Sequence, residues 1–324
     1  MIQPLIRFGF GFLLAYVAVL PIALAQGYPS RPVKIVVASA PGSTPDIVAR
    51  LLGQELAKEW GQGVVIENKA SAGGAVAIQQ ILQSPADGYT LLLSPSSATS
   101  LAPAMFKLPY DVREDLSGIT RIANVPNVLI VHPSVPARNL KEFIELVRSR
   151  PGKLNYASTA TGTPSHLDGE LFKSLTGVDM LHVPYKGSPA ALMAVLNGEV
   201  QAMFCPVAIA LPYLKQGKLK ALGVTTSQRS EILPDVPSIG EAEVPSYATA
   251  QWYGLFARAG TPAAIIKKLN SDTVRIMRAP AVDAVLKPLG VNSFTSTPAE
   301  LEDFLGKEIN KWKRLVADAK IVAD

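Results

Sequence analysis

The sequence predicts an α/β protein of two domains, with parallel-rich sheets flanked by helices and a hinge of two crossing strands. Three observations favour this fold class. Short apolar runs alternate with amphipathic helical patterns, polar turns rich in glycine and hydroxyl groups follow several of these runs, and two proline-marked extended segments interrupt the alternation. A chain of 324 residues is long enough for two such domains.

Residues 1–25 are predicted to form a cleaved export signal. Arg7 is the single early charge, the run FGFGFLLAYVAVL is apolar, and ALA before Gln26 is a small-residue cleavage site. A membrane anchor is the weaker alternative, because Pro21 and two glycines interrupt the apolar run and no stop-transfer pattern flanks it. The residue directly after the cleavage site is Gln26 and not a cysteine, which disfavours a lipid anchor. We expect the mature chain to begin at Gln26.

The predicted strands and helices then follow one another along the chain. VKIVVA precedes a helix over 45–60, GVVIEN precedes a helix over 75–82, YTLLL precedes a polar turn, and NVLIVH precedes a helix over 140–148. The first of these helices has its apolar residues on one face and ends at Gly61. This alternation is typical of sheets covered by helices on both faces.

Two extended segments, 121–136 and 245–262, are predicted to cross between the domains as a hinge. The block between them has its own alternation of strands and helices. In the simplest arrangement this block is an inserted domain 2, residues 124–250, while residues 26–123 and 251–324 together form domain 1. A ligand cleft is then expected between the two domains.

Four turns that follow strands carry the candidate ligand-binding residues. These are Gly42, Ser43 and Thr44 in the first turn, Ser71, Ala72, Gly73 and Gly74 in the second, Ser94, Ser96 and Ser97 in the third, and Ser158, Thr159, Thr161 and Gly162 in the inserted domain. Because the carboxyl ends of parallel strands meet at one edge of a sheet, we expect the turns to converge on the cleft. Backbone N–H groups and hydroxyls suit a carboxylate ligand. For each turn taken alone, ordinary helix capping is the alternative interpretation.

Composition argues against several other classes of function. The net charge is +5 and the basic residues are scattered, which disfavours nucleic-acid binding. Cys205 is the only cysteine, so the chain has no disulfide and is held together by burial. CxxC and HExxH patterns are absent, and His132, His166 and His182 are far apart in the sequence. We therefore expect neither a metal site nor a cofactor.

With these residues in view, nearly all of the mature chain resembles the Bug family of extracytoplasmic solute receptors of tripartite tricarboxylate transporters. The resemblance rests jointly on YPSRPVKIVV, PNVLIVHPSVPARNLKEFIELVRSRPGKLNYAS, HVPYKGSPAALMAVLNGEVQAMF and LPDVPSIGEAEVPSYATAQWYGLFARAGTPA. It implies a monomeric periplasmic binding protein of the Venus-flytrap, type II-like architecture. Such a protein captures a small di-, tri- or aromatic carboxylate and delivers it to integral-membrane transporter subunits or, in some members, informs a sensor kinase.

The resemblance also implies how the turns share the ligand. Gly42 to Thr44 and Ala72 to Gly74 would hold one carboxylate, and the turn of the inserted domain would meet the other end of the ligand. Three residues depart from the common pattern of the family: Ser43 and Ser71 stand where glycine is usual, and Cys205 stands where aspartate is frequent. Because an aspartate suits a ligand ammonium, Cys205 disfavours amino-acid ligands.

Several individual residues leave two interpretations open. His166 either contacts a ligand oxygen or caps its own turn, and Cys205 either faces the ligand or is a small buried apolar residue. Lys186 is either the one positive charge near the cleft or an ordinary exposed lysine. A secreted hydrolase is a minor alternative, because Ser165 beside His166 does not make a dyad by adjacency and GxSxG is missing.

Overall fold

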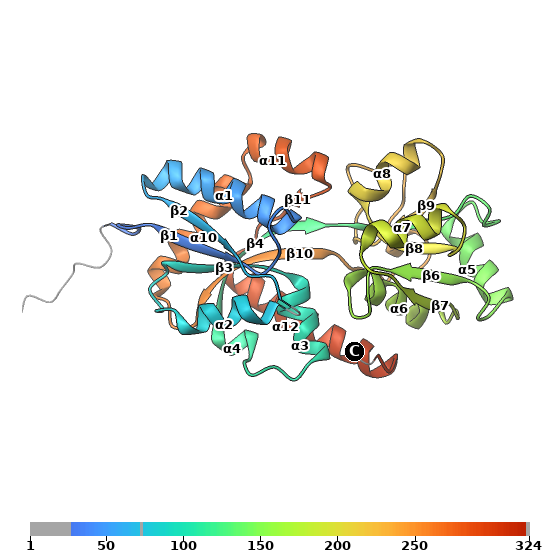
Figure 1. The fold of residues 1–324 in the computed structure, drawn as a ribbon, viewed down its shortest axis with the longest axis horizontal. Helices are drawn as coiled ribbons and strands as arrows, with labels where there is room; N and C mark the ends of the chain where they lie inside the picture. The colour runs from blue at the N-terminus through green and yellow to red at the C-terminus, as the bar shows by residue number, and fades with distance from the viewer. Residues whose placement is uncertain (1–26, 72–73, 322–324) are drawn as a thin grey trace, which may run out of the picture.

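The computed structural model describes residues 27–71 and 74–321, and it consists of two lobes that lie side by side (Figure 1). Each lobe is built on one β-sheet, of six strands in the first lobe and five in the second. The predicted export signal, Ala72 and Gly73 lie outside the described residues. Within the described residues, no helix is long and apolar enough to span a membrane.

The sheet of the first lobe has the order β11-β4-β10-β3-β1-β2. Its strands are β1 (Val33–Val37), β2 (Val64–Asn68), β3 (Thr90–Pro95), β4 (Leu116–Val125), β10 (Gln251–Arg258) and β11 (Asn292–Ser293). The sheet of the second lobe has the order β7-β6-β8-β5-β9. Its strands are β5 (Asn127–Val131), β6 (Asn155–Ser158), β7 (Leu181–Pro184), β8 (Ala202–Pro206) and β9 (Lys220–Val224).

Both sheets are mixed rather than parallel throughout. β1 pairs parallel with β2 and β3, and β6 pairs parallel with β7 and β8, as the alternation of strands and helices predicts. β10 runs antiparallel to β3 and β4, and β5 runs antiparallel to β8 and β9. The reason is the hinge: β10 enters the first sheet from the second lobe and β5 enters the second sheet from the first lobe, so each runs against its neighbours.

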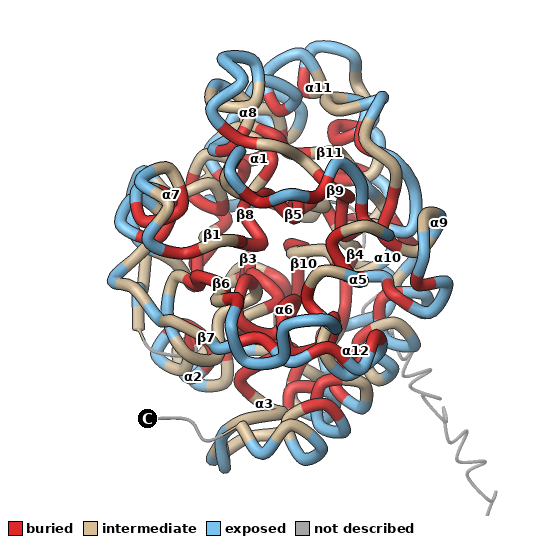
Figure 2. The backbone as a smooth tube through the Cα atoms, turned by 90° about the vertical axis from the view of Figure 1, so that its right-hand side faces the viewer, coloured by how far each residue is buried: buried red, intermediate tan, exposed pale blue. Residues whose placement is uncertain are grey.

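Helices cover both faces of each sheet, as predicted. The first lobe has α1 (Thr44–Trp60), α2 (Ala75–Gln83), the π-helical turn η2 (Ser97–Leu101), α3 (Ala102–Met105), α4 (Val112–Asp115), α10 (Ala263–Met277), α11 (Pro280–Leu286), the 3-10 turn η3 (Lys287–Leu289) and α12 (Pro298–Asp318). The second lobe has α5 (Leu140–Ser149), α6 (Pro164–Thr176), α7 (Ser188–Leu196), α8 (Val207–Lys215) and α9 (Ile239–Ala242). Figure 2 shows that the buried backbone runs mainly through the strands between these helices.

Each sheet therefore has two buried cores, one on each face. In the first lobe, α1, α10 and α11 contribute to one core and α2 and α12 to the other. In the second lobe, α5 and α6 contribute to one core and α7 and α8 to the other. Trp312 and Leu315, near the end of α12, are buried in the same cluster as Leu171 and Phe172 of α6. The last turns of α12 thus connect the first lobe to the second.

The connection between the lobes fits the predicted pair of crossing segments. β4 and β5 are separated only by Pro126 and belong to different sheets, and the chain returns through residues 245–250 into β10. The predicted domain boundary at 123/124 falls inside β4, and the one at 250/251 falls directly before β10. The boundaries themselves stay a prediction.

Candidate functional site

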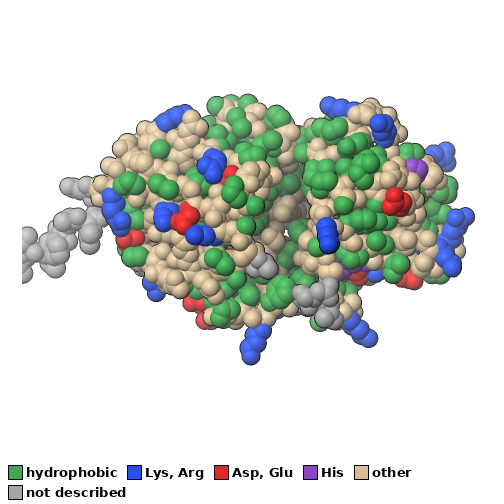
Figure 3. Space-filling model, in the orientation of Figure 1, with side chains coloured by type: hydrophobic (Ala, Val, Ile, Leu, Met, Phe, Trp, Pro, Cys, Tyr) green, Lys and Arg blue, Asp and Glu red, His purple; other side chains and the backbone are tan. Residues whose placement is uncertain are grey.

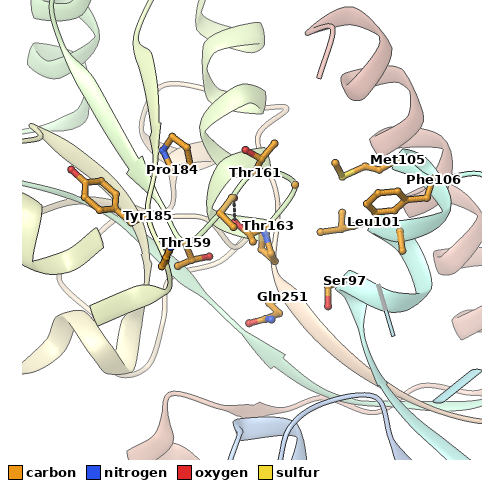
Figure 4. Close-up of a pocket in the computed structure, with 15 residues that line it drawn as sticks. Ser97, Leu101, Met105, Phe106, Thr159, Thr161, Thr163, Pro184, Tyr185 and Gln251 are labelled. Carbon is orange, nitrogen blue, oxygen red and sulfur yellow. Dashed lines mark hydrogen bonds between the residues drawn. The ribbon is translucent and has the colours of Figure 1, made fainter. Parts of the chain in front are cut away.

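A cavity of about 730 Å³ lies between the two lobes. Figure 3 shows the hollow at the junction of the lobes, and Figure 4 shows the side chains that meet there. The first lobe contributes Ser97, Leu101, Ala102, Met105 and Phe106, the second contributes residues 159–164 and 184–186, and Gln251 lies at the start of β10. The two lobes are also in close contact here. A Cβ built on Gly162 of the second lobe would lie only 2.5 Å from Cε of Met105 of the first lobe. We call this space the cleft chamber.

A smaller cavity of about 270 Å³ adjoins the cleft chamber in the first lobe. It lies at the carboxyl ends of β1, β2 and β3 and is lined by Ala38, Ser39, Ala40, Pro45, Ala70, Ser71, Pro95, Ser97 and Gln251. Ser97 and Gln251 line both cavities, so the two spaces meet at these residues. We call the smaller space the polar recess. Its position confirms that the strand ends of the first lobe face the cleft.

The two adjoining cavities differ in chemical character. The recess presents three serines, Ser39, Ser71 and Ser97, whereas Leu101, Met105 and Phe106 form an apolar wall of the chamber. Among the described residues that line the two cavities, Lys186 is the only charged side chain, and no aspartate or glutamate is present. This combination suits a ligand with a polar anionic end and an apolar body.

The polar groups of the first predicted turn form hydrogen bonds within the turn and with α1. The N–H of Gly42 donates to Oδ2 of Asp46 at 2.8 Å, and the hydroxyl of Ser43 donates to the carbonyl of Ala40 at 2.6 Å. Gly42 is exposed, and neither it nor Ser43 or Thr44 lines a cavity. In this structure these groups are bonded within their own turn and to Asp46 of α1, and ligand binding by these residues stays a prediction. Their neighbours Ser39 and Ala40 line the recess instead.

The turn of the second lobe repeats this arrangement. The N–H of Gly162 donates to Nδ1 of His166 at 3.0 Å, and the hydroxyl of Thr163 donates to the carbonyl of Ala160 at 2.7 Å. His166 is buried and lies outside the cleft chamber, with its ring stacked on His182 at 3.9 Å between centroids. Of the two interpretations for His166, the structure supports the capping role, since its ring is bonded to its own turn.

The other predicted residues of the second lobe divide between core and cavity. Thr159, Thr161 and Gly162 line the cleft chamber, as predicted. Ser158 is fully buried at the end of β6, where its hydroxyl hydrogen-bonds to Nε2 of His182 at 2.6 Å. Burial, and then the neighbouring His166, lower the pKa of His182 to about 4. Ser158 therefore anchors the start of the turn to β7 through His182, and it does not line the cleft chamber.

The second predicted turn reaches the recess through Ser71 alone among its described residues. The Ser71 hydroxyl accepts from the N–H of Val76 at 3.1 Å, and its carbonyl accepts from the N–H of Gly74 at 3.1 Å. Gly74 is buried with φ +67°, and a Cβ added there would lie 2.4 Å from Cβ of Ala98. Glycine is required here by packing against η2, and the contribution of Gly74 to ligand binding stays a prediction.

The third predicted turn is helical. The serine-rich segment after β3 forms η2 and continues into α3, because the apolar residues Ala98 and Leu101 pack into the cores. Ser94 and Ser96 are buried, with the Ser96 hydroxyl accepting from the N–H of Trp252 at 3.4 Å. Only Ser97 of the three predicted serines lines the cavities. The Ser96 hydroxyl thus links the end of β3 to β10, whereas the Ser94 hydroxyl bonds to the adjacent carbonyl of Pro95.

Cys205 does not face the ligand space. It lies on β8, fully buried in the cluster that includes Val128, Ala191 and Val207, and burial raises the pKa of its thiol to about 12. Cys205 lines neither of the two cavities, and a ligand contact by its side chain stays a prediction. Its side chain points into a sheet core, as the alternative interpretation states.

The sequence interpretation missed Gln251 and the apolar wall. Gln251 is the first residue of β10 and lies between Ser97 and the Thr159–Thr163 turn in Figure 4. A polar residue at the entry of a crossing strand was a usable signal. Leu101, Met105 and Phe106 gave no such signal, because they follow a serine-rich segment that resembles a turn. Phe106 remains 44% exposed, which is high for a phenylalanine outside an interface or a site.

A buried carboxyl group lies beside the hinge. Asp168 of α6 is 3% exposed, and Nδ2 of Asn127, the first residue of β5, donates to its Oδ2 at 2.7 Å. Burial raises the pKa of Asp168 to about 6, although the hydrogen bond from Asn127 lowers it. Because the pKa in the folded state is above the usual value of the unfolded chain, the contribution of Asp168 to stability is lost as the pH rises through about 6.

We therefore predict that Asp168→Asn stabilises the protein at pH 8 and not at pH 4. The difference between the ordinary aspartate pKa and the value of about 6 in the folded protein corresponds to up to about 3 kcal/mol in the free energy of unfolding. Urea unfolding at pH 4, 6 and 8 measures the difference between variant and wild type, which removes contributions from other groups. The exposed Asp179→Asn is the control and should change little at any pH. A variant less stable than wild type at pH 8 would contradict the prediction.

Comparison with known proteins identifies the family. The family model of the tripartite tricarboxylate transporter family receptor matches residues 48–321. The chain belongs to this receptor family. As a member, it is similar to Protein BugT of Bordetella pertussis, with 34% identity over 313 residues that cover 95% of each chain. The predicted resemblance to the Bug family is thereby confirmed.

Solved structures agree with the receptor fold. The receptor is similar to R. palustris Rpa4515, solved with adipate, with 33% identity, a TM-score of 0.76, and coverage of 91% of this chain and 99% of that one. It is also similar to MatC of Rhodopseudomonas palustris with bound malate, with 34% identity, a TM-score of 0.71, and coverage of 89% and 99%. The predicted periplasmic-binding-protein architecture, with two helix-flanked sheets, is confirmed by these similarities.

Proposed function

We propose that this receptor is a periplasmic solute-binding protein that captures a small carboxylate between its lobes and delivers it to the membrane subunits of a tripartite tricarboxylate transporter. The observation that carries the proposal is the pair of adjoining cavities, lined by both lobes and by Gln251 of the crossing strand, with Lys186 as the one charged side chain among the described lining residues. The family and the adipate and malate in related structures support a carboxylate ligand.

In this proposal residues 26–123 with 251–324 and residues 124–250 act as two domains that close on the ligand. One carboxylate lies in the polar recess near Ser39, Ser71 and Ser97, and the body of the ligand lies in the cleft chamber. Micromolar affinity needs about 8 kcal/mol, and one hydrogen bond to a charged group contributes about 1.5 to 3 kcal/mol. Several donors are required, so groups from both lobes contribute and closure accompanies binding.

The ligand class follows from the charges in the cavities. An amino acid would bring a buried α-ammonium, and no described lining residue offers a carboxylate to pair with it. The expectation that amino acids bind weakly therefore rests on the whole lining and no longer on Cys205. The apolar wall of Leu101, Met105 and Phe106 favours ligands with a hydrocarbon chain or ring between or beside the carboxylates.

We predict that unaminated carboxylates bind at least tenfold more tightly than aspartate and glutamate, a difference of at least about 1.4 kcal/mol. Titration calorimetry of the mature protein with adipate, malate, succinate, glutarate, citrate, terephthalate, aspartate and glutamate tests both the proposal and the preference. Binding without turnover of the ligand supports a receptor. If no carboxylate binds, the proposed function fails, and if an amino acid binds most tightly, the argument from the cavity charges fails.

A further inference from the structure

A second cavity, which the proposed ligand does not use, lies at the hinge. It has a volume of about 460 Å³ and is lined by residues of both lobes, including Arg121 and Asn124 of β4 and the segment 226–229 that follows β9. Ala248, Thr249 and Ala250 line this cavity, whereas the next residue, Gln251, lines the cleft chamber. The returning segment of the hinge therefore separates the two spaces. We call the second space the hinge cavity.

Arg121 is held rigidly in the wall of the hinge cavity. Its guanidinium carbon lies 4.1 Å from the ring centroid of Phe294 and 3.9 Å from that of Phe304, so the planar group is enclosed between two aromatic rings. Nη2 donates to Oδ1 of Asn124 at 2.6 Å. This bond fixes the orientation of the Asn124 amide and leaves its NH₂ group as a donor.

Arg121 forms no ion pair within 4 Å with a carboxylate of the described residues, although Glu308 lies near enough to stabilise its charge. Its buried Nε has no hydrogen-bond partner among those residues. The acidic groups that line the cavity have other partners: Glu308 accepts from Lys311 and from Nε1 of Trp312, and Glu231 pairs with Lys287 at 2.9 Å. Burial lowers the pKa of Arg121 to about 10, so the group stays cationic at neutral pH.

A half-buried arginine beside an open cavity, with a buried Nε–H that has no partner among the described residues, requires an explanation. Leaving a charged donor unsatisfied in a buried position costs free energy, whereas an oxyanion accepts both the charge and the hydrogen bonds. A rigid guanidinium fork is the side chain best suited to bind planar carboxylates or tetrahedral oxyanions. The amides of Asn124, Gln228 and Asn292, which also line the cavity, add neutral donors.

We propose that the hinge cavity binds a small oxyanion through Arg121 and Asn124, as a site separate from the cleft. Because the lining comes from both lobes, the bound anion contacts both and changes the free energy of their relative orientation. By linkage, the anion and the cleft ligand then influence each other's affinity.

Intrinsic tryptophan fluorescence gives a direct test, because two tryptophans report on the wall of the cavity. Trp252 packs against Phe304 at 5.4 Å between centroids, and Trp312 is bonded to Glu308. Inorganic phosphate, sulfate and acetate are titrated separately into the protein without cleft ligand, with sodium chloride keeping the ionic strength constant. We expect a saturable change for at least one oxyanion and none for chloride alone.

Variants assign the response to the hinge cavity. Arg121→Gln should weaken oxyanion binding at least tenfold, while Lys141→Gln, which removes a charge from an exposed position on α5, should change it less than twofold. Asn124→Asp places a carboxylate beside Arg121 and should also weaken binding at least tenfold, and it keeps the proposal testable if Arg121→Gln does not fold. The absence of a saturable response, a response unchanged in Asn124→Asp, or one removed by Lys186→Gln in the cleft would each overturn the proposal.

Discussion

Replacing Ser97 by phenylalanine is expected to reduce carboxylate affinity at least a thousandfold, or about 4 kcal/mol. Ser97 is the first residue of η2 and, with Gln251, lines both the cleft chamber and the polar recess. A benzyl group at this position lies where the two cavities adjoin, so a ligand can no longer place one end in each. Calorimetry with the tightest-binding carboxylate of the panel measures the loss.

Ser97→Ala is the matched control for this prediction. It adds no bulk where the two cavities adjoin and removes only the hydroxyl, so its loss should not exceed about 3 kcal/mol, the upper value for a hydrogen bond to a charged group. Circular dichroism melting checks that both variants are folded. If folded Ser97→Phe retains wild-type affinity, the ligand does not extend across the two cavities, and our placement of its carboxylate in the recess is wrong.

The sequence predicted regular elements well where local signals determine their ends. The helix expected over 45–60 is α1, Thr44–Trp60, and Gly61 ends it in a left-handed conformation with φ +63°. The helix expected over 140–148 is α5, Leu140–Ser149, and the Asn139 side chain caps it. Capping depends on residues within one turn of the helix end, so a single sequence contains the required information.

The binding residues are harder to assign from the sequence, because the polar groups of the predicted turns also bond within their own turns. The spacing of Gly42 and Asp46, and of Gly162 and His166, is four residues in each lobe, and each side chain accepts the N–H of its glycine. The sequence contains that spacing, but it does not show whether a polar side chain turns back to its own loop or outward to a ligand. Both turns carry the glycines and hydroxyls expected of an anion site, and in this structure the glycine N–H groups and the hydroxyls are bonded within the turn and the first turn of the helix.

The position of Cys205 depends on strand register, which one sequence does not determine. Cys205 pairs with Val128 in β5 and faces the core covered by α7 and α8, whereas Phe204 faces the core covered by α5 and α6. Successive strand residues point to opposite faces of a sheet, so both side chains are buried when helices cover both faces. Proximity to a cleft is then limited to residues at the strand ends.

Substituting Gly74 by alanine is expected to destabilise the fold by about 2 to 5 kcal/mol. A non-glycine residue in the left-handed region costs about 1 to 2 kcal/mol. Overpacking adds about 1 to 3 kcal/mol, because the new Cβ would lie 2.4 Å from Cβ of Ala98 and 3.3 Å from Cβ of Ala38. Urea unfolding of the protein without ligand measures the change in the free energy of unfolding.

Gly61→Ala separates the two contributions. Gly61 has φ +63°, close to the +67° of Gly74, but no described atom lies within 4 Å of the Cβ that would be added. It should therefore cost only the conformational part, about 1 to 2 kcal/mol. The difference between the two variants measures the contact with Ala98, which joins α2 to η2 and so supports the position of Ser97. Equal losses in the two variants would show that η2 moves away from α2 at no cost in free energy. The position of Ser97 in the lining of the recess would then not be fixed by this contact.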